Sequence, residues 1–391
     1  MKLKLLFFVF LFTTVFVNAQ KLKLTADAEV SILTIGPGES LNDAFGHNAF
    51  RIKDDNYVLD LVYGYGEYDF DTPNFYLKFA QGKLNYLISR ENFSRFYKRY
   101  KFYDRTIDEQ VLNLTVEEKQ NLFSYLENNY KPENRRYLYD FFYDNCATRI
   151  RDVTETVTTG NVNFTVPKDF KTKSFRTLIH DHVGLNTWGG FGIDIALGSI
   201  IDKEATPKEY MFLPKYINAF FGTATLNSSE NLIKNSTTIY EKKEENSVPN
   251  FLYSPLMIFG FIGLIILFFT YKDYKNNTRS KWLDLILFAT TGIIGVLLLL
   301  LWFATDHSAT AQNYNLLWAF PLNLFVIGQL LKPKVKNWFR SYLKFLIIIL
   351  SLLTLHWIIG VQVFAIGLIP LLIALFIRYL FLVKFYHLIK E

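Results

Sequence analysis

The pattern of apolar and polar residues divides the chain near residue 250. Before this point, short apolar clusters alternate with polar ones, and after it Leu, Ile and Phe dominate long runs. Alternating patterns are typical of a folded domain in water, whereas a membrane span needs about 20 consecutive apolar residues. We therefore expect a soluble domain followed by a membrane domain.

The first part of the chain predicts a sheet built mainly from hairpins. Residues 28–35 have the pattern of a strand and end at Gly36-Pro37-Gly38. A hairpin is expected from two further strands joined at residues 54–56. The strands predicted after the first are residues 49–53, 57–63, 83–90 and 105–113. Residues 73–80 are expected to be helical or irregular.

Two helices carry clear start signals. Thr115 with Glu118 three residues later is a capping box, and it predicts a helix over residues 115–130. A second helix is expected over residues 145–154, with Asp144 or Asn145 as its cap. A mainly antiparallel sheet with a few helices predicts an α+β domain rather than alternating βαβ units.

The second part of the chain predicts five transmembrane helices. Residues 226–250 are rich in Asn, Ser, Thr, Lys and Glu, and are expected to form a linker to a membrane domain at 251–391. The expected spans are about 251–271, 282–303, 314–331, 345–359 and 361–383. Basic loops at 272–281 and 332–344 are predicted to be cytoplasmic, as is the C-terminus, and loop 304–313 has no Lys or Arg.

The amino terminus is typical of a secretory signal peptide. Lys2 and Lys4 precede an apolar run, and Val17-Asn18-Ala19 resembles a cleavage site, so residues 1–19 are the expected signal and 20–225 the exported domain. The net charge is +6, but many Lys and Arg residues flank the apolar spans. We therefore expect a protein of the bacterial inner membrane that binds no nucleic acid.

The chain contains one cysteine, Cys146, so an intramolecular disulfide is impossible. An unpaired cysteine exported to an oxidising compartment is a candidate reactive thiol or an intermolecular partner. A buried inert thiol is the alternative interpretation.

The immediate neighbours of Cys146 and of His47 favour the reactive interpretation. Cys146 would lie in the first turn of the second helix, where exposed amides and the positive helix end favour a thiolate. A neighbouring imidazole would stabilise it further as an ion pair. His47 is the candidate, because it opens the predicted hairpin directly after Gly46, a glycine that lets the backbone approach another element closely. A helix-start cysteine facing a sheet histidine is the papain arrangement, and a circular permutation would explain the reversed chain order.

Several separate motifs give residues 26–225 a resemblance to the N-terminal periplasmic domain of the Lnb family of lipoprotein N-acyltransferases. The matching stretches are Phe45-Gly46-His47-Asn48-Ala49-Phe50-Arg51, Tyr63-Gly64, Tyr68-Asp69-Phe70, residues 74–79, Asp140 to Arg149, Leu197 to Asp202 and Met211 to Pro214. The membrane segment is similar through Thr305-Asp306-His307 and residues 313–318.

The resemblance implies a fold related to permuted NlpC-type, papain-like thiol enzymes. It also implies acyl transfer from a phospholipid to the α-amino group of a lipoprotein, with no cofactor. Phospholipid, lipoprotein and membrane are the expected partners. His180 and His182 lack a convincing set of further ligands, so no metal is expected.

Roles for other residues remain open at this level. Asn48 and Asn145 are candidate oxyanion donors, although a residue in the position of Asn145 is more often simply a helix cap. Val62 stands where the resemblance implies an asparagine that orients His47, so the orienting residue would be Asp60, Tyr63 or one from elsewhere in the chain. An exposed strand charge is the alternative for Asp60. Arg149 would meet a lipid phosphate or form a helix-surface salt bridge. Asp306 and His307, expected outside, would bind a headgroup or the acceptor amine.

Two rival functions share these features. The same Cys–His pair with water as acceptor would be a membrane-anchored hydrolase, namely a peptidase, amidase or lipase. A non-enzymatic envelope receptor or scaffold would need neither side chain.

Overall fold

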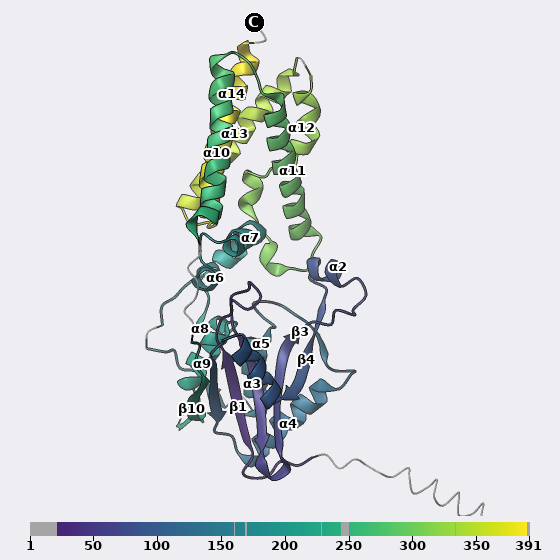
Figure 1. Cartoon of the computed structure of the whole chain (residues 1–391), viewed down its shortest axis with the longest axis vertical. Helices are drawn as coiled ribbons and strands as arrows, with labels where there is room; N and C mark the ends of the chain where they lie inside the picture. Colours follow the sequence, from purple (N-terminus) through teal and green to yellow (C-terminus); the bar gives the residue numbers. More distant parts are fainter. Residues whose placement is uncertain are drawn as a thin grey trace, which may run out of the picture.

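The computed structural model describes residues 22–388, apart from 160, 169, 228, 244–249 and 333. A soluble α+β domain and a helical bundle are stacked along the long axis of the molecule (Figure 1). The last helix ends at the end of the bundle farthest from the sheet (Figure 1). The expected signal peptide lies outside the described residues.

The soluble domain is built on a seven-stranded sheet in the order β10-β5-β1-β2-β3-β4-β6, in which every neighbouring pair is antiparallel. Its strands are β1 (Glu29–Ile35), β2 (His47–Asp54), β3 (Leu59–Glu67), β4 (Asn85–Asn92), β5 (Ile107–Leu112), β6 (Arg136–Leu138) and β10 (Ile233–Tyr240). A small sheet joins β7 (Val162–Asn163), β8 (Thr225–Leu226) and β9 (Glu230–Asn231).

Alternation along the strands gives the large sheet two covered faces. One face carries Leu33 and Ala49 and packs against α3 (Phe93–Phe102) through Phe96. The other face carries Phe50 and packs against α4 (Val116–Tyr130), α5 (Cys146–Val157) and α9 (Pro214–Gly222). The remaining helices of this domain are α2 (Phe75–Ala80), α6 (Phe175–Val183), α7 (Trp188–Ala196) and α8 (Pro207–Tyr210), with 3-10 turns η2 (Asp55–Tyr57) and η3 (Ser199–Asp202).

The predicted strands, hairpin and capped helices of the first part are confirmed. The expected linker is wrong in its first half, because β10 is an edge strand paired with β5. Most of its side chains are exposed, so a polar sequence costs little there. Helix α3 was also not predicted.

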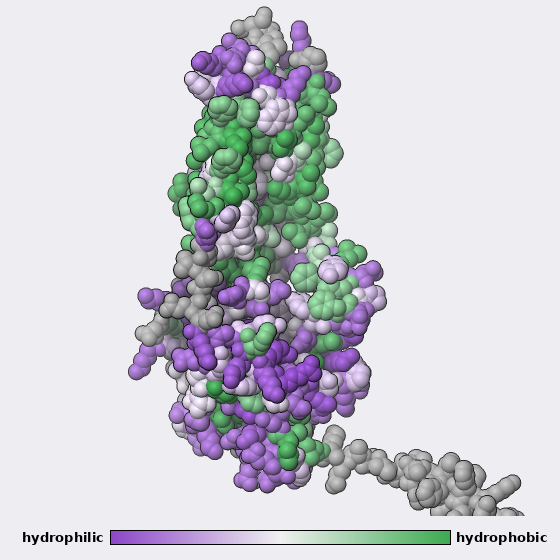
Figure 2. Space-filling model, in the orientation of Figure 1, coloured by the Kyte–Doolittle hydropathy of each residue, from purple (hydrophilic) through white to green (hydrophobic). Residues whose placement is uncertain are grey.

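Among the described residues, four segments are long and apolar enough to cross a membrane. They are α10 (Pro255–Lys275), α11 (Lys281–Phe303), α13 (Asn337–Ile358) and residues Ile366–His387, which include most of α14 (Ile369–Leu388). Figure 2 shows an apolar band on the visible face of this bundle, with hydrophilic surface on the soluble domain and at the opposite end.

Four of the five predicted spans are thus found, and the prediction is corrected only for the third, at residues 314–331, which is not one continuous helix. This segment is divided into η6 (Tyr314–Leu317) and the short α12 (Asn323–Leu330). Pro321 lies between them and has no N–H to continue a helix. Buried amides occupy both pieces: Asn315 donates to Asp194 O at 2.8 Å, and Asn323 to Thr291 Oγ1 at 2.8 Å.

The soluble domain is docked on the bundle through α7 and η3. Asn313 Nδ2 donates to Ile195 O at 2.8 Å, and Gly198 N donates to Ala309 O at 2.9 Å. A Cβ on Gly198 would stand 1.8 Å from Ala311 O, so only glycine allows this approach. These contacts fix the position of the sheet relative to the bundle.

Candidate active site

Cys146 is the first residue of α5, and Asn145 fixes it there. Asn145 Oδ1 accepts hydrogen bonds from Ala147 N at 2.8 Å and Thr148 N at 2.9 Å. Its Nδ2 donates to Phe141 O at 2.7 Å and Phe212 O at 2.8 Å. The whole amide is thus engaged in capping the helix and tying it to two loops. Asn145 is a cap, and its side chain has no free donor for an oxyanion.

His47 is the first residue of β2, and two glycines define its place. Gly46 has φ +82°, and a Cβ there would lie 2.6 Å from Ile35 O. A Cβ on Gly64 of β3 would lie 3.2 Å from His47 Nε2. The expected close backbone approach at Gly46 is confirmed, and Gly64 gives the imidazole a flat surface to lie on.

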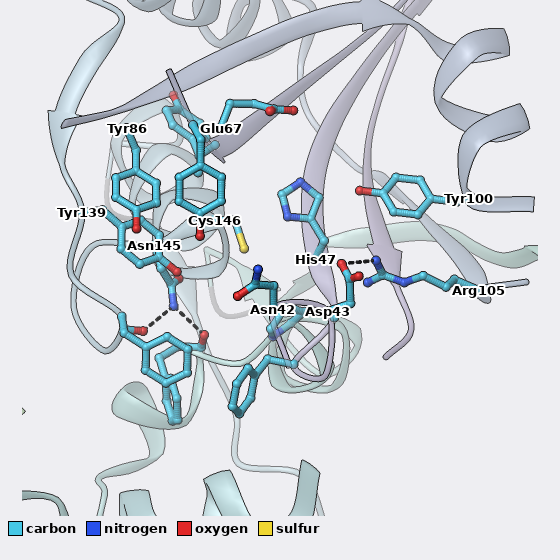
Figure 3. A pocket seen from close by; sticks show the side chains of 18 of the residues that line it. Asn42, Asp43, His47, Glu67, Tyr86, Tyr100, Arg105, Tyr139, Asn145 and Cys146 are labelled. Atoms are coloured by element: carbon cyan, nitrogen blue, oxygen red, sulfur yellow. Dashed lines mark hydrogen bonds and ion pairs between the residues drawn. The ribbon is translucent and has the colours of Figure 1, made fainter. Parts of the chain in front are cut away.

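His47 and Cys146 line one cavity of about 460 Å³ at the start of β2. By strand alternation His47 lies on the α3 side of the sheet, with Ala49, while Cys146 enters from α5 on the other side. Figure 3 shows the sulfur and the imidazole directed into the same space. The other lining residues include Asn42, Asp43, Phe45, Tyr65, Glu67, Tyr68, Tyr86, Arg99, Tyr100, Arg105, Tyr139, Phe141, Phe212 and Pro214.

The cavity holds this pair in its neutral form. The pKa of His47 is lowered from 6.5 to about 4, mainly by burial and then by the charges of Arg105 and Arg99, while Asp43 acts in the opposite direction. Burial raises the pKa of Cys146, although backbone N–H groups of Asn48, Ala147 and Cys146 lower it. Both directions favour the neutral thiol and imidazole over the ion pair that the sequence favours, because desolvation opposes the effect of the helix-start amides.

Arg105 is a pocket residue that sequence reasoning missed. Its Nε donates to Gly36 O at 2.9 Å and its Nη1 to Asp43 Oδ1 at 2.9 Å. The side chain is buried, and its Nη2 has no hydrogen-bond partner among the described residues. No local motif marks Arg105 as special. Only the pairing of β5 with β1 brings it next to the loop that carries Asp43.

The residues expected to orient His47 lie elsewhere. Asp60 is engaged by Arg51, whose Nε and Nη2 donate to its carboxylate at 2.7 and 2.8 Å. Tyr63 donates to Glu127 of α4, on the opposite face of the sheet. Neither lines the cavity, so both predictions are corrected. Asp43, in the loop between β1 and β2, is the carboxylate whose charge acts on His47.

Asn48 acts through its backbone rather than through its side chain. Its Nδ2 donates to Thr34 Oγ1 at 2.9 Å inside the sheet, and the side chain is fully buried. Its backbone N–H, in contrast, is directed at the Cys146 sulfur. The prediction of a side-chain oxyanion donor at this position is therefore wrong.

The three residues expected to bind substrate do not line the cavity. Arg149 forms a bidentate salt bridge with Asp144 and stacks on Tyr137. Of the two alternatives for this residue, the structure therefore has the salt bridge. Asp306 N donates to Gln81 O at 2.8 Å, and His307 Nε2 lies 3.2 Å from Phe79 O. Asp306 and His307 thus join the membrane domain to α2.

The fold and the cavity define a membrane-anchored α+β domain with a partly buried cysteine and histidine in one cavity at its membrane-facing end. The chain belongs to the Lnb family: the Lnb N-terminal periplasmic domain matches residues 17–180 and the Lnb transmembrane domain matches residues 243–388. No curated protein and no solved structure matches the chain. Family membership suggests a lipoprotein-modifying membrane enzyme, and it supports an inner-membrane location with a periplasmic domain.

Proposed function

We propose that the protein is a lipoprotein N-acyltransferase that carries a phospholipid acyl chain on Cys146 as a thioester. The observation that supports this most is the single thiol of the chain placed with a neutral imidazole in one cavity. A helix-start cysteine beside a sheet histidine is the arrangement of a permuted papain-like enzyme.

In the first half-reaction, His47 accepts the thiol proton while the Cys146 sulfur attacks the ester carbonyl of the donor lipid. The backbone N–H groups directed at the sulfur lie where negative charge develops on the adjacent carbonyl oxygen. The ester C–O bond then breaks, and His47 returns the proton to the lysophospholipid oxygen. Because the pKa of His47 is about 4, its protonated form is a strong acid for this step.

In the second half-reaction, the lipoprotein amine attacks the thioester carbonyl. His47 accepts the amine proton, the C–S bond breaks, and the proton returns to the Cys146 sulfur. A thioester is less stable than an amide, so the transfer proceeds without a nucleotide or any other cofactor. The products are an N-acylated lipoprotein and one lysophospholipid.

Arg105 is suited to the phosphate of the donor. Its Nη2 is buried without a hydrogen-bond partner among the described residues, and Arg105 and Arg99 line the same cavity as Cys146. Guanidinium groups are the preferred partners of phosphate oxygens, and a buried donor without a partner gains most from one. This arrangement would hold the donor ester near Cys146.

Anchoring gives the reaction a physical advantage, because both substrates are confined to a bilayer. A catalytic domain fixed to the same surface meets them at a higher effective concentration. The periplasmic side follows if the basic loops at the far end of the bundle are cytoplasmic, and the C-terminus then lies in the cytoplasm as well.

The proposal is tested with the full chain in phospholipid vesicles supplied with a diacylated lipopeptide. We expect an N-acylated peptide and an equal amount of lysophospholipid from wild-type protein, and neither from Cys146→Ala. Release of free fatty acid without N-acylation would establish a hydrolase instead. Equal product from wild type and Cys146→Ala would exclude a thiol enzyme.

A further inference from the structure

Residues 68–80, here called the aromatic segment, form an apolar surface at the upper edge of the soluble domain. They include α2 and the turn before it. Phe70 is 69% exposed and Tyr76 is 81% exposed, and Leu77 and Phe79 are exposed beside them. Single exposed apolar residues are ordinary, but a contiguous group indicates an interaction surface.

Hydrogen bonds fix the height of this segment relative to the bundle. Asp306 N donates to Gln81 O, and His307 Nε2 lies 3.2 Å from Phe79 O. Both belong to the loop that follows α11, a candidate membrane span ending at Phe303. Figure 1 places α2 beside this end of α11, and Figure 2 shows apolar atoms at that place, close to the apolar band. The segment therefore lies at the level where this candidate span ends.

Other exposed aromatic residues occur at the start of α10. Phe251 and Tyr253 are exposed immediately before that helix, and Trp188 Nε1 donates to Tyr253 O at 2.8 Å. Tyr and Trp residues concentrate at the interfaces of membranes, where their rings contact both lipid and water. The aromatic segment is part of the same interfacial level.

A row of ring contacts connects the aromatic segment with the cavity. Tyr139 stacks on Tyr86 with centroids 4.2 Å apart, and Tyr86 meets Tyr68 at 4.9 Å. Tyr68 contacts Phe75 at 6.0 Å, and Phe75 contacts Phe70 at 4.8 Å. Tyr68, Tyr86 and Tyr139 also line the cavity of Cys146. One continuous aromatic wall thus runs from the nucleophile to the exposed surface.

We propose that the aromatic segment is inserted into the adjacent leaflet of a phospholipid bilayer, and that this wall is the route by which an acyl chain reaches Cys146. The insertion is inferred only from the position and the exposure of the aromatic segment, whereas the route rests on the proposed function. Lys78 within the segment and Lys83 just after it favour anionic headgroups at this surface.

Insertion is tested by a fluorescent label in the leaflet. Because Cys146 is the only cysteine, Cys146→Ala provides a background for Tyr76→Cys labelled with a polarity-sensitive dye. The control is Tyr57→Cys in the same background, because Tyr57 is 52% exposed in the β2–β3 turn, far from the bundle. In vesicles of phosphatidylethanolamine and phosphatidylglycerol, shallow spin-labelled lipids should quench the label at 76 several-fold more than at 57. Equal quenching would overturn the insertion.

The route is tested by Tyr76→Asp, with Tyr57→Asp as the control. Acyl transfer from vesicle phospholipid should fall about tenfold or more in Tyr76→Asp, and transfer from water-soluble dihexanoyl phosphatidylcholine should stay within about twofold. An unchanged rate from vesicles would overturn the route. Wild-type protein that transfers no chain from either donor would overturn the proposed function and with it the route, while the label still decides the insertion.

Discussion

The Nε2 atom of His47 lies 3.2 Å from the point where a Cβ on Gly64 would stand. This contact means that the residue type at Gly64 sets the position of the imidazole. Ser89 Oγ lies 3.2 Å from the same point, so a side chain at Gly64 has no free space on either side. Gly64 of β3 thus controls the position of His47 of β2 relative to Cys146 of α5.

We expect Gly64→Ala to displace the imidazole and lower kcat/KM by about tenfold to a hundredfold, since small misplacements of a catalytic group have effects of that size. Gly192→Ala is the matched control, because a Cβ at Gly192 meets nothing within 4 Å. Kinetics of acyl transfer check both variants. An unaffected Gly64→Ala enzyme would mean that His47 does not act from this position.

The charge of Arg105 should be visible in the pH profile. A base with a pKa of about 4 is unprotonated above that pH, so kcat/KM of the wild type should fall only as the pH drops through about 4. Arg105→Gln removes a cation that lowers the pKa of His47, so the acidic limb should move to higher pH. Arg105→Lys keeps the charge and should leave the limb near its wild-type position. An identical limb in all three proteins would contradict this electrostatic account.

Cys146 should react slowly with alkylating reagents at neutral pH. Burial raises the pKa of its thiol, so the rate of labelling by iodoacetamide should still be rising above pH 9. The control is Cys146→Ala/Tyr57→Cys, whose exposed thiol should titrate near the ordinary value. A plateau of Cys146 labelling at pH 5–6 would instead indicate a resting ion pair.

Asn145 should contribute to both stability and activity. Asn145→Ala removes an N-cap, which costs about 0.5–2 kcal/mol, and leaves the carbonyls of Phe141 and Phe212 without this donor. Thr115→Ala removes the exposed cap of α4 and should lower stability alone. Thermal unfolding and acyl-transfer assays separate the two. An Asn145→Ala protein with wild-type stability but no activity would restore the oxyanion role.

Arg149 should be dispensable for substrate binding. Its guanidinium is held by Asp144 and does not line the cavity. We expect Arg149→Gln to keep KM for the phospholipid within about twofold of the wild type, measured with the same vesicles. A tenfold rise of KM would return Arg149 to the donor site.

The sequence alone was sufficient for the features that depend on local signals. Alternation and turn residues gave the hairpin of β2 and β3, and cap residues gave α4 and α5 with Cys146 at a helix start. The pairing of Cys146 with His47 required the family resemblance as well as helix geometry. Gly46 was correctly expected to allow a close backbone approach.

Features set by tertiary contacts were beyond a local pattern. Arg105 lines the cavity only because β5 pairs with β1. Asp60 does not reach the cavity, because its carboxylate is paired with Arg51 of the neighbouring strand β2. The polar strand β10 is stable only as an edge of the sheet. The broken third span depends on Asn315, which bonds to α7 of the other domain.

The most direct test of the central claim is the intact mass of the full chain after incubation with phospholipid vesicles and no acceptor. The account predicts the addition of one acyl chain to Cys146, with one lysophospholipid released and the chain removable by hydroxylamine. Adding a diacylated lipopeptide should discharge it onto the peptide amine. N-acylated peptide formed without any acyl group on Cys146, or formed equally by Cys146→Ala, would contradict the account.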